Sequence, residues 1–269
     1  MTGLSEAEVA GYHKDGVLVP DYRLPGHRLS ELRETLDRVL AENPGVRPEQ
    51  LVSIHIEGRN SEGVRGSEAF LELARDPALL DRVAQLIGGD IILWGCHLFC
   101  KPAGDGMEVP WHQDGHYWPI RPLATCTLWL ALDDSTVENG CLRVIPGCHR
   151  EQRLYDHLTD EREGLALTRR IDSEVFDQAD ALDVELEAGQ MSMHDVYMIH
   201  GSNPNHSTER RAGVAIRYMP ATSHFDREMY RPGTANGFLV DFANRPLWLL
   251  RGVDRSGKND FTIGHRAAV

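Results

Sequence analysis

Three side chains that suit a metal ion, and one that suits an anion, stand at informative spacings. His112 and Asp114 are two residues apart, His200 follows later in the chain, and Arg211 comes eleven residues after His200. Two imidazoles and one carboxylate can bind Fe(II) on one face and leave the opposite positions open. A guanidinium beyond them can hold the far carboxylate of a co-substrate that chelates the metal. The spacing therefore predicts an oxygen-activating iron site.

Strands are the elements best suited to present these ligands. On an extended strand the side chains of His112 and Asp114 leave the same face, so one strand end delivers both to a single ion. His200 ends the β-rich run 190–200, which is predicted to be a neighbouring strand of the same barrel. The H-x-D pair alone is a weak signal, and the whole series WHQD, ENGCLRVIPG, HGSNPN and RRAG makes it specific.

His194 is the main rival for the third ligand position. It lies six residues before His200, so on one continuous strand both side chains face the same way. We predict that His200 is the ligand, because Ser202 and Arg211 belong to its sequence context, and that His194 packs or hydrogen-bonds near the site.

Composition places limits on the class of protein. The 269 residues suffice for one large domain with a full core, and no run approaches the ~18 apolar residues that a membrane span needs. Forty-one acidic and 28 basic side chains give a net charge of −13, which disfavours nucleic acid as a partner. We therefore expect a small-molecule substrate, no nucleic-acid or membrane partner, and a monomer or homodimer.

The cysteines and the chain start indicate a compartment. Five cysteines form no C-x-x-C pair and leave an odd thiol, so a zinc or disulfide framework is not expected. The first sixteen residues lack the basic and apolar regions of a secretory signal. Both observations predict a reducing, cytoplasmic location.

The sequence pattern divides the chain into a helical part and a β-rich part, which are predicted to form one domain. Residues 1–89 read as a largely helical outer layer: Ser5 and Glu8 form a capping box, and Pro77 opens the last helix. Residues 90–220 contain short β-rich runs separated by turn residues, and residues 221–269 look irregular. This order predicts a mainly β, antiparallel two-sheet barrel of the jelly-roll kind, with the helices packed outside it.

The motifs also carry a family resemblance. WHQDGHYWPIRP, ENGCLRVIPGCHR and HGSNPNHSTERR resemble the phytanoyl-CoA dioxygenase (phytanoyl-CoA hydroxylase) family of Fe(II)/2-oxoglutarate oxygenases. Weaker similarity extends from the N-terminal helix to Tyr218, so it covers most of the chain. The resemblance implies a double-stranded β-helix, the cofactors Fe(II) and 2-oxoglutarate, O2 as oxidant, and release of succinate and CO2.

Residue roles follow from the resemblance. It implies that the metal centre alone is catalytic, and that Arg211 pairs with the distal carboxylate of 2-oxoglutarate. The implied iron ligands are His112, Asp114 and His200, and the implied co-substrate contacts are Arg211, Ser202, Trp129, Gln113 and His97. His97 falls where relatives often place a different residue facing the co-substrate.

Substrate contacts are harder to assign. His116 supports the metal ligands from behind, faces the substrate, or is simply a partly buried histidine. Trp118 packs the barrel end, walls the substrate pocket, or does both. His149 either stabilises its loop or lines the substrate mouth.

Several functions compete. The leading hypothesis is a hydroxylase that acts on an unactivated C–H of a small or medium organic metabolite. Desaturation, cyclisation or epimerisation by the same iron chemistry stays open, and a halogenase is disfavoured because Asp114 fills the position that a halide needs. A cupin-like, non-enzymatic metal or small-molecule binding protein is the alternative from another class, but it has no use for Arg211 at this spacing.

Overall fold

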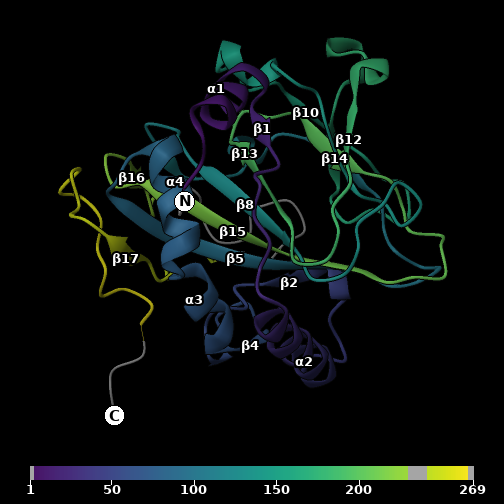
Figure 1. Ribbon diagram of the computed structural model, residues 1–269, viewed down its shortest axis with the longest axis horizontal. Helices are drawn as coiled ribbons and strands as arrows, with labels where there is room; N and C mark the ends of the chain where they lie inside the picture. Colours follow the sequence, from purple (N-terminus) through teal and green to yellow (C-terminus); the bar gives the residue numbers. More distant parts are fainter. Residues whose placement is uncertain (1–2, 230–240, 266–269) are drawn as a thin grey trace.

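The computed structural model describes residues 3–229 and 241–265 and is mainly β, with helices near its N-terminus (Figure 1). Residues 230–240 and 266–269 of the predicted C-terminal segment lie outside the described residues. The α-helices are α1 (Glu6–Asp15), α2 (Gly26–Glu42), α3 (Glu68–Ala74) and α4 (Pro77–Ile87). The predicted capping box is confirmed, since Ser5 Oγ accepts from Glu8 N at 3.3 Å and Glu8 Oε2 accepts from Ser5 N at 2.7 Å.

Seven antiparallel strands form the large sheet. Its order is β1-β13-β8-β15-β5-β17, and β2 also pairs with β5. The strands are β1 (Val17–Leu18), β2 (Leu51–Val52), β5 (Ile91–Lys101), β8 (Cys126–Ala131), β13 (Met191–Asp195), β15 (Arg211–Pro220) and β17 (Trp248–Arg251). β5 and β15 are the longest and run side by side through its middle, where β15 also pairs with β8.

A four-stranded sheet lies opposite the large one. Its order is β12-β9-β14-β6. The strands are β6 (Val109–His112), β9 (Leu142–Val144), β12 (Leu182–Val184) and β14 (His200–Ser202). Three short ladders complete the described strands: β3 (Gly58–Arg59) with β4 (Arg65–Gly66), β7 (Ile120–Arg121) with β16 (His224–Phe225), and β10 (His157–Thr159) with β11 (Arg169–Ile171).

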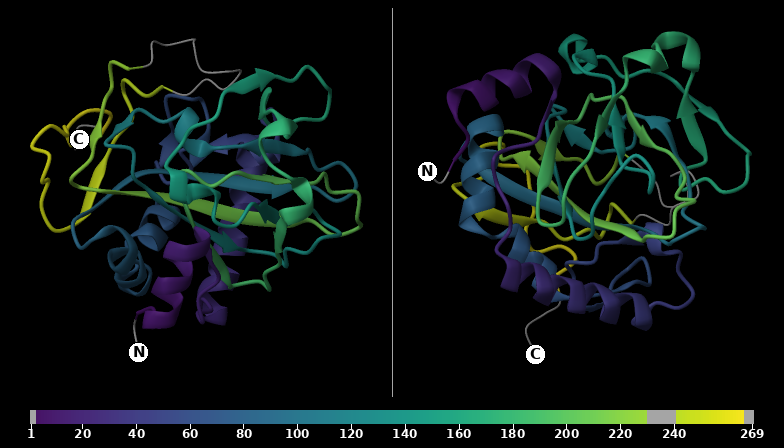
Figure 2. Two further views of the ribbon diagram at one scale, coloured as in Figure 1. Left: turned by 90° about the horizontal axis from the view of Figure 1, so that it is seen from above. Right: turned by 45° about the vertical axis from the view of Figure 1, so that its right-hand side comes forward.

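Two apolar layers hold these elements together. Helix residues such as Leu36, Phe70 and Leu79 pack on the outer face of the large sheet, so the helices line one side of the molecule (Figures 1 and 2). On the inner face, Trp129 and Ala215 pack in one cluster with small-sheet residues that include Val144 and Val184. The site lies in this inner layer, between the sheets.

The predicted barrel is the point at which the fold departs from expectation. The large and small sheets share no ladder among the described residues, so hydrogen bonding does not close the two sheets into a barrel. Two short strands of the N-terminal part, β1 and β2, join the large sheet, which the sequence had not predicted.

The run 190–200 is not one strand, as the sequence had predicted. β13 ends at Asp195, and β14 begins at His200 in the other sheet. The side chain of Asp195 accepts a hydrogen bond from Tyr197 N at 2.8 Å, which is the local turn that lets the chain cross between sheets. His194 and His200 therefore approach the interior from opposite sheets.

The cysteines and the lengths of the helices bear on the environment of the domain. All five cysteines are free, and Cys96 and Cys100 pack in the core. No helix within residues 3–229 and 241–265 has the length and apolarity needed to cross a bilayer.

Candidate metal centre

His112, Asp114 and His200 meet at one point between the sheets. His112 and His200 are direct partners of the antiparallel β6–β14 ladder, and Gln113 has extended backbone, so Asp114 returns to the same side as His112. His112 Nε2 lies 3.7 Å from Asp114 Oδ1, and His200 Nε2 lies 4.0 Å from Asp114 Oδ2. One ligand atom from each residue lies within 4.8 Å of the others, a spacing that suits one metal ion.

The two imidazoles are oriented for metal binding by their backbone contacts. His112 Nδ1 lies 2.8 Å from Pro110 O, and His200 Nδ1 lies 3.0 Å from Met198 O. A carbonyl oxygen can only accept, so each Nδ1 carries the proton and each Nε2 presents its lone pair to the site.

Electrostatics keep His200 and Asp114 in the protonation states that a metal requires. Burial lowers the pKa of His200 well below its usual value, so this imidazole is neutral. Burial opposes ionisation of Asp114, but the adjacent His112 side chain and the charge of Arg217 outweigh it and hold the pKa of the carboxyl well below its usual range. His200 thus offers a neutral imidazole, and Asp114 a carboxylate, to a metal.

His194 stands close to this set from the large sheet. Its Nε2 lies 4.0 Å from Asp114 Oδ2, and its ring centroid lies 5.0 Å from that of His200. Neither ring nitrogen has a hydrogen-bond partner among the described residues. It packs beside the cluster, as the sequence had predicted.

A cavity of about 490 Å³ leads from the three candidate ligands to Arg211. The predicted co-substrate residues Trp129 and Ser202 line it. Its other walls come from Phe99, Val109, Thr127, Leu142, His194, Gly201, Ala215 and Arg217. The cavity thus joins a metal-binding end to a cationic end.

Arg211 is a buried cation that lacks an acidic partner. Its Nη2 donates to Gly140 O at 2.6 Å and to Ser202 Oγ at 3.5 Å, and its guanidinium carbon lies 5.3 Å from the centroid of the Trp129 ring. No carboxylate within residues 3–229 and 241–265 pairs with it, and the other residues include no Asp or Glu. Burial lowers the pKa of Arg211 to about 10, so it remains charged at neutral pH. The Arg211 end of the cavity is therefore suited to an anion.

Small residues in the motifs make room for this arrangement. A Cβ on Gly213 would lie 2.1 Å from the Trp129 ring, so the RRAG glycine lets that indole lie across β15. Gly140 of the ENG turn has φ +80°, and a Cβ there would meet Asn203 O at 2.3 Å. Buried Lys101 donates to Asn203 O and, at 3.4 Å, to Ser202 O, which fixes the turn that carries Ser202.

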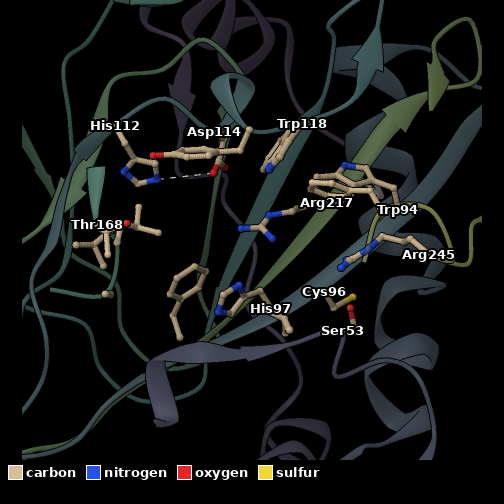
Figure 3. Close-up of a pocket in the computed structure, with 17 residues that line it drawn as sticks. Ser53, Trp94, Cys96, His97, His112, Asp114, Trp118, Thr168, Arg217 and Arg245 are labelled. Atoms are coloured by element: carbon tan, nitrogen blue, oxygen red, sulfur yellow. Dashed lines mark ion pairs between the residues drawn. The ribbon is translucent and has the colours of Figure 1, made fainter. Parts of the chain in front are cut away.

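A second, larger cavity of about 880 Å³ opens on the other side of His112 and Asp114 (Figure 3). The predicted substrate residue Trp118 lines it, together with Trp94, Tyr117 and Phe242. Both cavities share Phe99, Val109, His112, Asp114 and Arg217. The candidate metal centre therefore sits at the junction of two chambers, which we call the Arg211 chamber and the Trp94 chamber.

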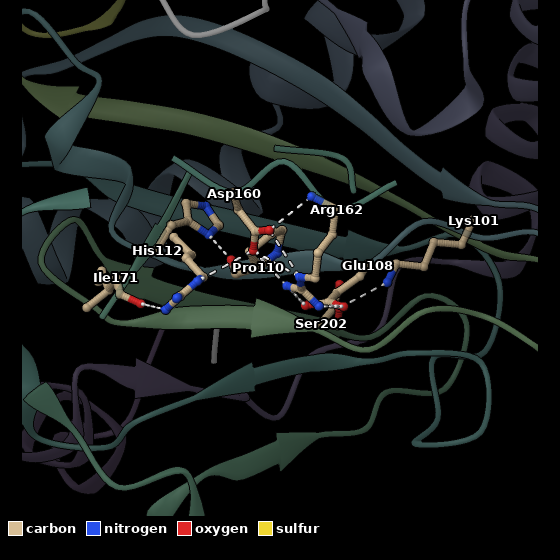
Figure 4. A network of polar contacts seen from close by, with 9 residues as sticks. Lys101, Glu108, Pro110, His112, Asp160, Arg162, Ile171 and Ser202 are labelled. Carbon is tan, nitrogen blue, oxygen red and sulfur yellow. Dashed lines mark hydrogen bonds and ion pairs between the residues drawn. The ribbon is translucent and has the colours of Figure 1, made fainter. Parts of the chain in front are cut away.

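One wall of the Trp94 chamber is tied to β6 by an ionic network (Figure 4). Arg162 pairs with Asp160 at 2.8 Å and with Glu108 at 3.1 Å, and Ala166 N donates to Glu108 O at 2.8 Å. This network holds the segment of Ala166, Leu167 and Thr168, which lines the chamber, against the strand that carries His112.

Four of the predicted contacts lie elsewhere. Gln113 faces away from both chambers, because it alternates with His112 and Asp114, and its amide binds Arg153 O, Tyr197 O and Tyr155 N. His97 lines the Trp94 chamber rather than the Arg211 chamber, because its ring bonds Glu49 O at 3.0 Å and stacks on Phe99.

His116 and His149 line neither chamber. His116 stacks on His157 at 4.0 Å between ring centroids, and His149 Nε2 lies 3.2 Å from His13 O. His149 therefore joins its loop to the N-terminal helix.

The sequence reasoning missed Arg217 and Lys101. Arg217 lies six residues after Arg211 on β15, so their equal parity was a signal that both side chains face the interior. The role of Lys101 depends on a turn a hundred residues away, and no local pattern indicated it.

A two-sheet domain with two histidines, one aspartate and a buried arginine at the end of the same cavity defines a class, the non-haem iron oxygenases that use 2-oxoglutarate. Residues 12–213 match the phytanoyl-CoA dioxygenase family. The chain belongs to this family of Fe(II)/2-oxoglutarate oxygenases.

Individual relatives agree with this assignment. The chain is 31% identical over 156 residues to a probable alpha-ketoglutarate-dependent hypophosphite dioxygenase of Stutzerimonas stutzeri, covering 57% of this chain and only about half (54%) of that protein. It is 24% identical over 226 residues to an ectoine dioxygenase of Streptomyces anulatus, covering 78% and 76% of the two chains. Among solved structures, CytC3 with Fe(II) and alpha-ketoglutarate superposes with a TM-score of 0.65 at 25% identity, covering 96% of this chain and 92% of that one.

Proposed function

We propose that this protein is an Fe(II)- and 2-oxoglutarate-dependent dioxygenase that hydroxylates an unactivated C–H of a small or medium organic metabolite, with release of succinate and CO2. One observation carries the proposal: the cluster of His112, Asp114 and His200 and the unpaired cation of Arg211 occupy opposite ends of one cavity. A molecule that chelates a metal at one end and carries a carboxylate at the other suits that cavity.

The donor set fits iron, and the far end fits a carboxylate. His112, Asp114 and His200 would hold Fe(II) through Nε2, a carboxylate oxygen and Nε2, leaving positions open on the opposite face. Arg211 and the Ser202 hydroxyl would hold the distal carboxylate of 2-oxoglutarate. When bound, the iron and co-substrate supply the oxidising power for C–H cleavage.

The residues of this chain contribute position and shelter. Trp129 lies against the Arg211 guanidinium, and Gly140 O accepts one of its N–H groups, so its remaining N–H groups are oriented before the co-substrate arrives. The Trp94 chamber reaches His112 and Asp114 from the other side, so a substrate there would present a C–H to the metal without displacing the co-substrate.

Three broader assignments belong to this proposal. The facing sheets support a double-stranded β-helix, the single-domain reading covers residues 1–269, and the free cysteines support a cytoplasmic location. A monomer or homodimer with a small-molecule substrate remains our expectation.

An anaerobic titration tests the cofactors directly. Fe(II) followed by 2-oxoglutarate should produce a weak visible charge-transfer band at one equivalent of each per chain. Iron binding without a band at saturating 2-oxoglutarate would contradict the proposal.

A screen of candidate metabolites for stimulated succinate release then tests the reaction. Under ¹⁸O2, mass spectrometry should show a hydroxylated product that carries the label. An unlabelled product with a new double bond or ring would move the assignment to desaturation or cyclisation.

A further inference from the structure

The Trp94 chamber contains a second buried cation, Arg217. It lies on β15 six residues after Arg211, and it lines both cavities beside His112 and Asp114. Figure 3 shows its guanidinium projecting into the chamber, between Asp114 and His97. Its charge helps to keep Asp114 ionised, but no other part of the proposed reaction uses it.

Aromatic faces, not acidic side chains, hold Arg217 in place. Its guanidinium carbon lies 5.5 Å from the Trp94 ring centroid and 5.0 Å from that of Trp118, and the two indoles meet edge to face at 4.5 Å. A guanidinium held by stacking keeps its in-plane N–H groups available for a ligand. Its Nε is buried without a hydrogen-bond partner in the described part of the chain.

No acidic side chain neutralises Arg217. Within residues 3–229 and 241–265, no carboxylate lies within 4 Å of its guanidinium, and the remaining residues contain neither Asp nor Glu. Burial lowers the pKa of Arg217 while Asp114 raises it, and an arginine so placed stays charged.

The other ionisable groups of the Trp94 chamber are already balanced. Arg245 pairs with Glu62 at 2.6 Å, and both side chains are buried. Burial lowers the pKa of His97 to about 3, so this ring is neutral. Asp114 is committed to the metal in the proposed enzyme, and Fe(II) with that carboxylate and the chelating carboxylate of 2-oxoglutarate has no net charge. The single positive charge of Arg217 is left over.

We propose that the substrate is an organic carboxylate whose anionic group binds Arg217 in the Trp94 chamber. The carboxylate receives two parallel N–H bonds from the guanidinium edge, and the apolar body lies against Trp94, Trp118 and Phe242. This inference rests on the proposed function and specifies its substrate class.

Matched acids and amides test the proposal without knowledge of the true substrate. The probes are octanoate, 4-phenylbutanoate, and the primary amide of each, which keep the body and remove the charge. Each is titrated anaerobically into the complex with Fe(II) and 2-oxoglutarate, and the charge-transfer band reports occupancy next to the metal. We expect the acids to shift the band and to bind at least about tenfold more tightly than the amides.

Variants then assign that preference to one residue. Arg217→Gln should weaken acid binding about ten- to hundredfold and change amide binding far less. Arg217→Lys keeps the charge without the forked geometry and should retain part of the preference. Arg38→Gln, an exposed arginine of α2, is the matched control and should bind as the unaltered protein does.

The outcomes separate this inference from the proposed function. Absence of the band with Fe(II) and 2-oxoglutarate overturns the function itself. A normal band with equal binding of acids and amides, or with no binding of any acid, overturns only the substrate class. If Arg217→Gln or Arg217→Lys instead raises the 2-oxoglutarate requirement, Arg217 serves the co-substrate and the inference is wrong.

Discussion

Arg211 and Arg217 lie six residues apart on one strand, yet different groups surround their side chains. Arg211 is fixed by a carbonyl at 2.6 Å, a hydroxyl at 3.5 Å and one indole, in a cavity of about 490 Å³. Arg217 is held only by aromatic faces, in a chamber of about 880 Å³. The first arrangement suits one ligand of fixed length, and the second suits ligands that share a charge but differ in shape.

The difference shows how one β-strand can serve two binding tasks. Alternation along β15 turns Arg211, Ala215 and Arg217 to the interior, and the small residue between the cations leaves room near the metal. The groups that line each chamber then determine which ligands it can bind. Turns and strand ends surround Arg211, whereas large side chains surround Arg217. Substitutions can disturb both chambers together or each one separately.

Removing Asp114 should have the largest effect, because this residue lines both chambers. Asp114→Ala deletes one of three candidate ligands and leaves two imidazoles, so we expect iron affinity to fall by more than about a hundredfold. Metal analysis after dialysis measures this, and circular dichroism checks that the fold persists. Full iron content and turnover in the variant would contradict the ligand assignment.

Removing Arg211 should affect the co-substrate and spare the metal. In Arg211→Ala the distal carboxylate of 2-oxoglutarate would be buried without its charged partner, a loss of roughly 3–5 kcal/mol by analogy with broken buried ion pairs. The 2-oxoglutarate concentration that half-saturates the charge-transfer band should rise by two orders of magnitude or more. Arg210→Ala, which breaks outward pairs with Asp133 and Asp37, is the neighbouring control.

The Trp94 chamber can be disturbed through the pair behind its wall. Glu62→Gln leaves Arg245 buried without a counter-charge, so the free energy of unfolding should fall by about 3 kcal/mol. Asp81→Asn breaks the partly exposed pair with Arg251 and should cost less than about 1 kcal/mol. Urea unfolding of both variants measures the difference. An equal loss of unfolding free energy in both variants would mean that burial of the Glu62–Arg245 pair does not increase its contribution to stability.

The sequence predicted the parts of this site that depend on local spacing. The H-x-D alternation, the capped first helix and the Pro77 start of α4 are encoded within a few residues, and the structure contains them. The family resemblance supplied the expectation for Arg211, which the structure places at the far end of the cavity from the triad.

Features that depend on distant partners were not predicted. The crossing between β13 and β14 contains no Gly or Pro, and its only local signal is Asp195, whose side chain caps the turn. The pairing of Glu62 with Arg245 joins residues that are 183 positions apart in the chain. The chamber that the His97 ring lines depends on its contact with the backbone oxygen of Glu49. Spacing alone cannot show which of two chambers an inward side chain reaches.

His194 offers the smallest expected effect and the sharpest test of the junction between the chambers. It stands as far from Asp114 Oδ2 as His200 does, 4.0 Å, but its ring nitrogens have no hydrogen bond in the described structure and its strand belongs to the other sheet. Burial also lowers its pKa to about 4, so it contributes no charge at neutral pH.

An apolar replacement of His194 removes an unpaired buried polar group, which costs little stability or is stabilising. His194→Leu should therefore keep iron, keep the charge-transfer band, and change the free energy of unfolding by no more than about 1 kcal/mol, whereas His200→Leu should lose the band. The reverse pattern, with the band lost in His194→Leu and kept in His200→Leu, would place the third ligand on the large sheet.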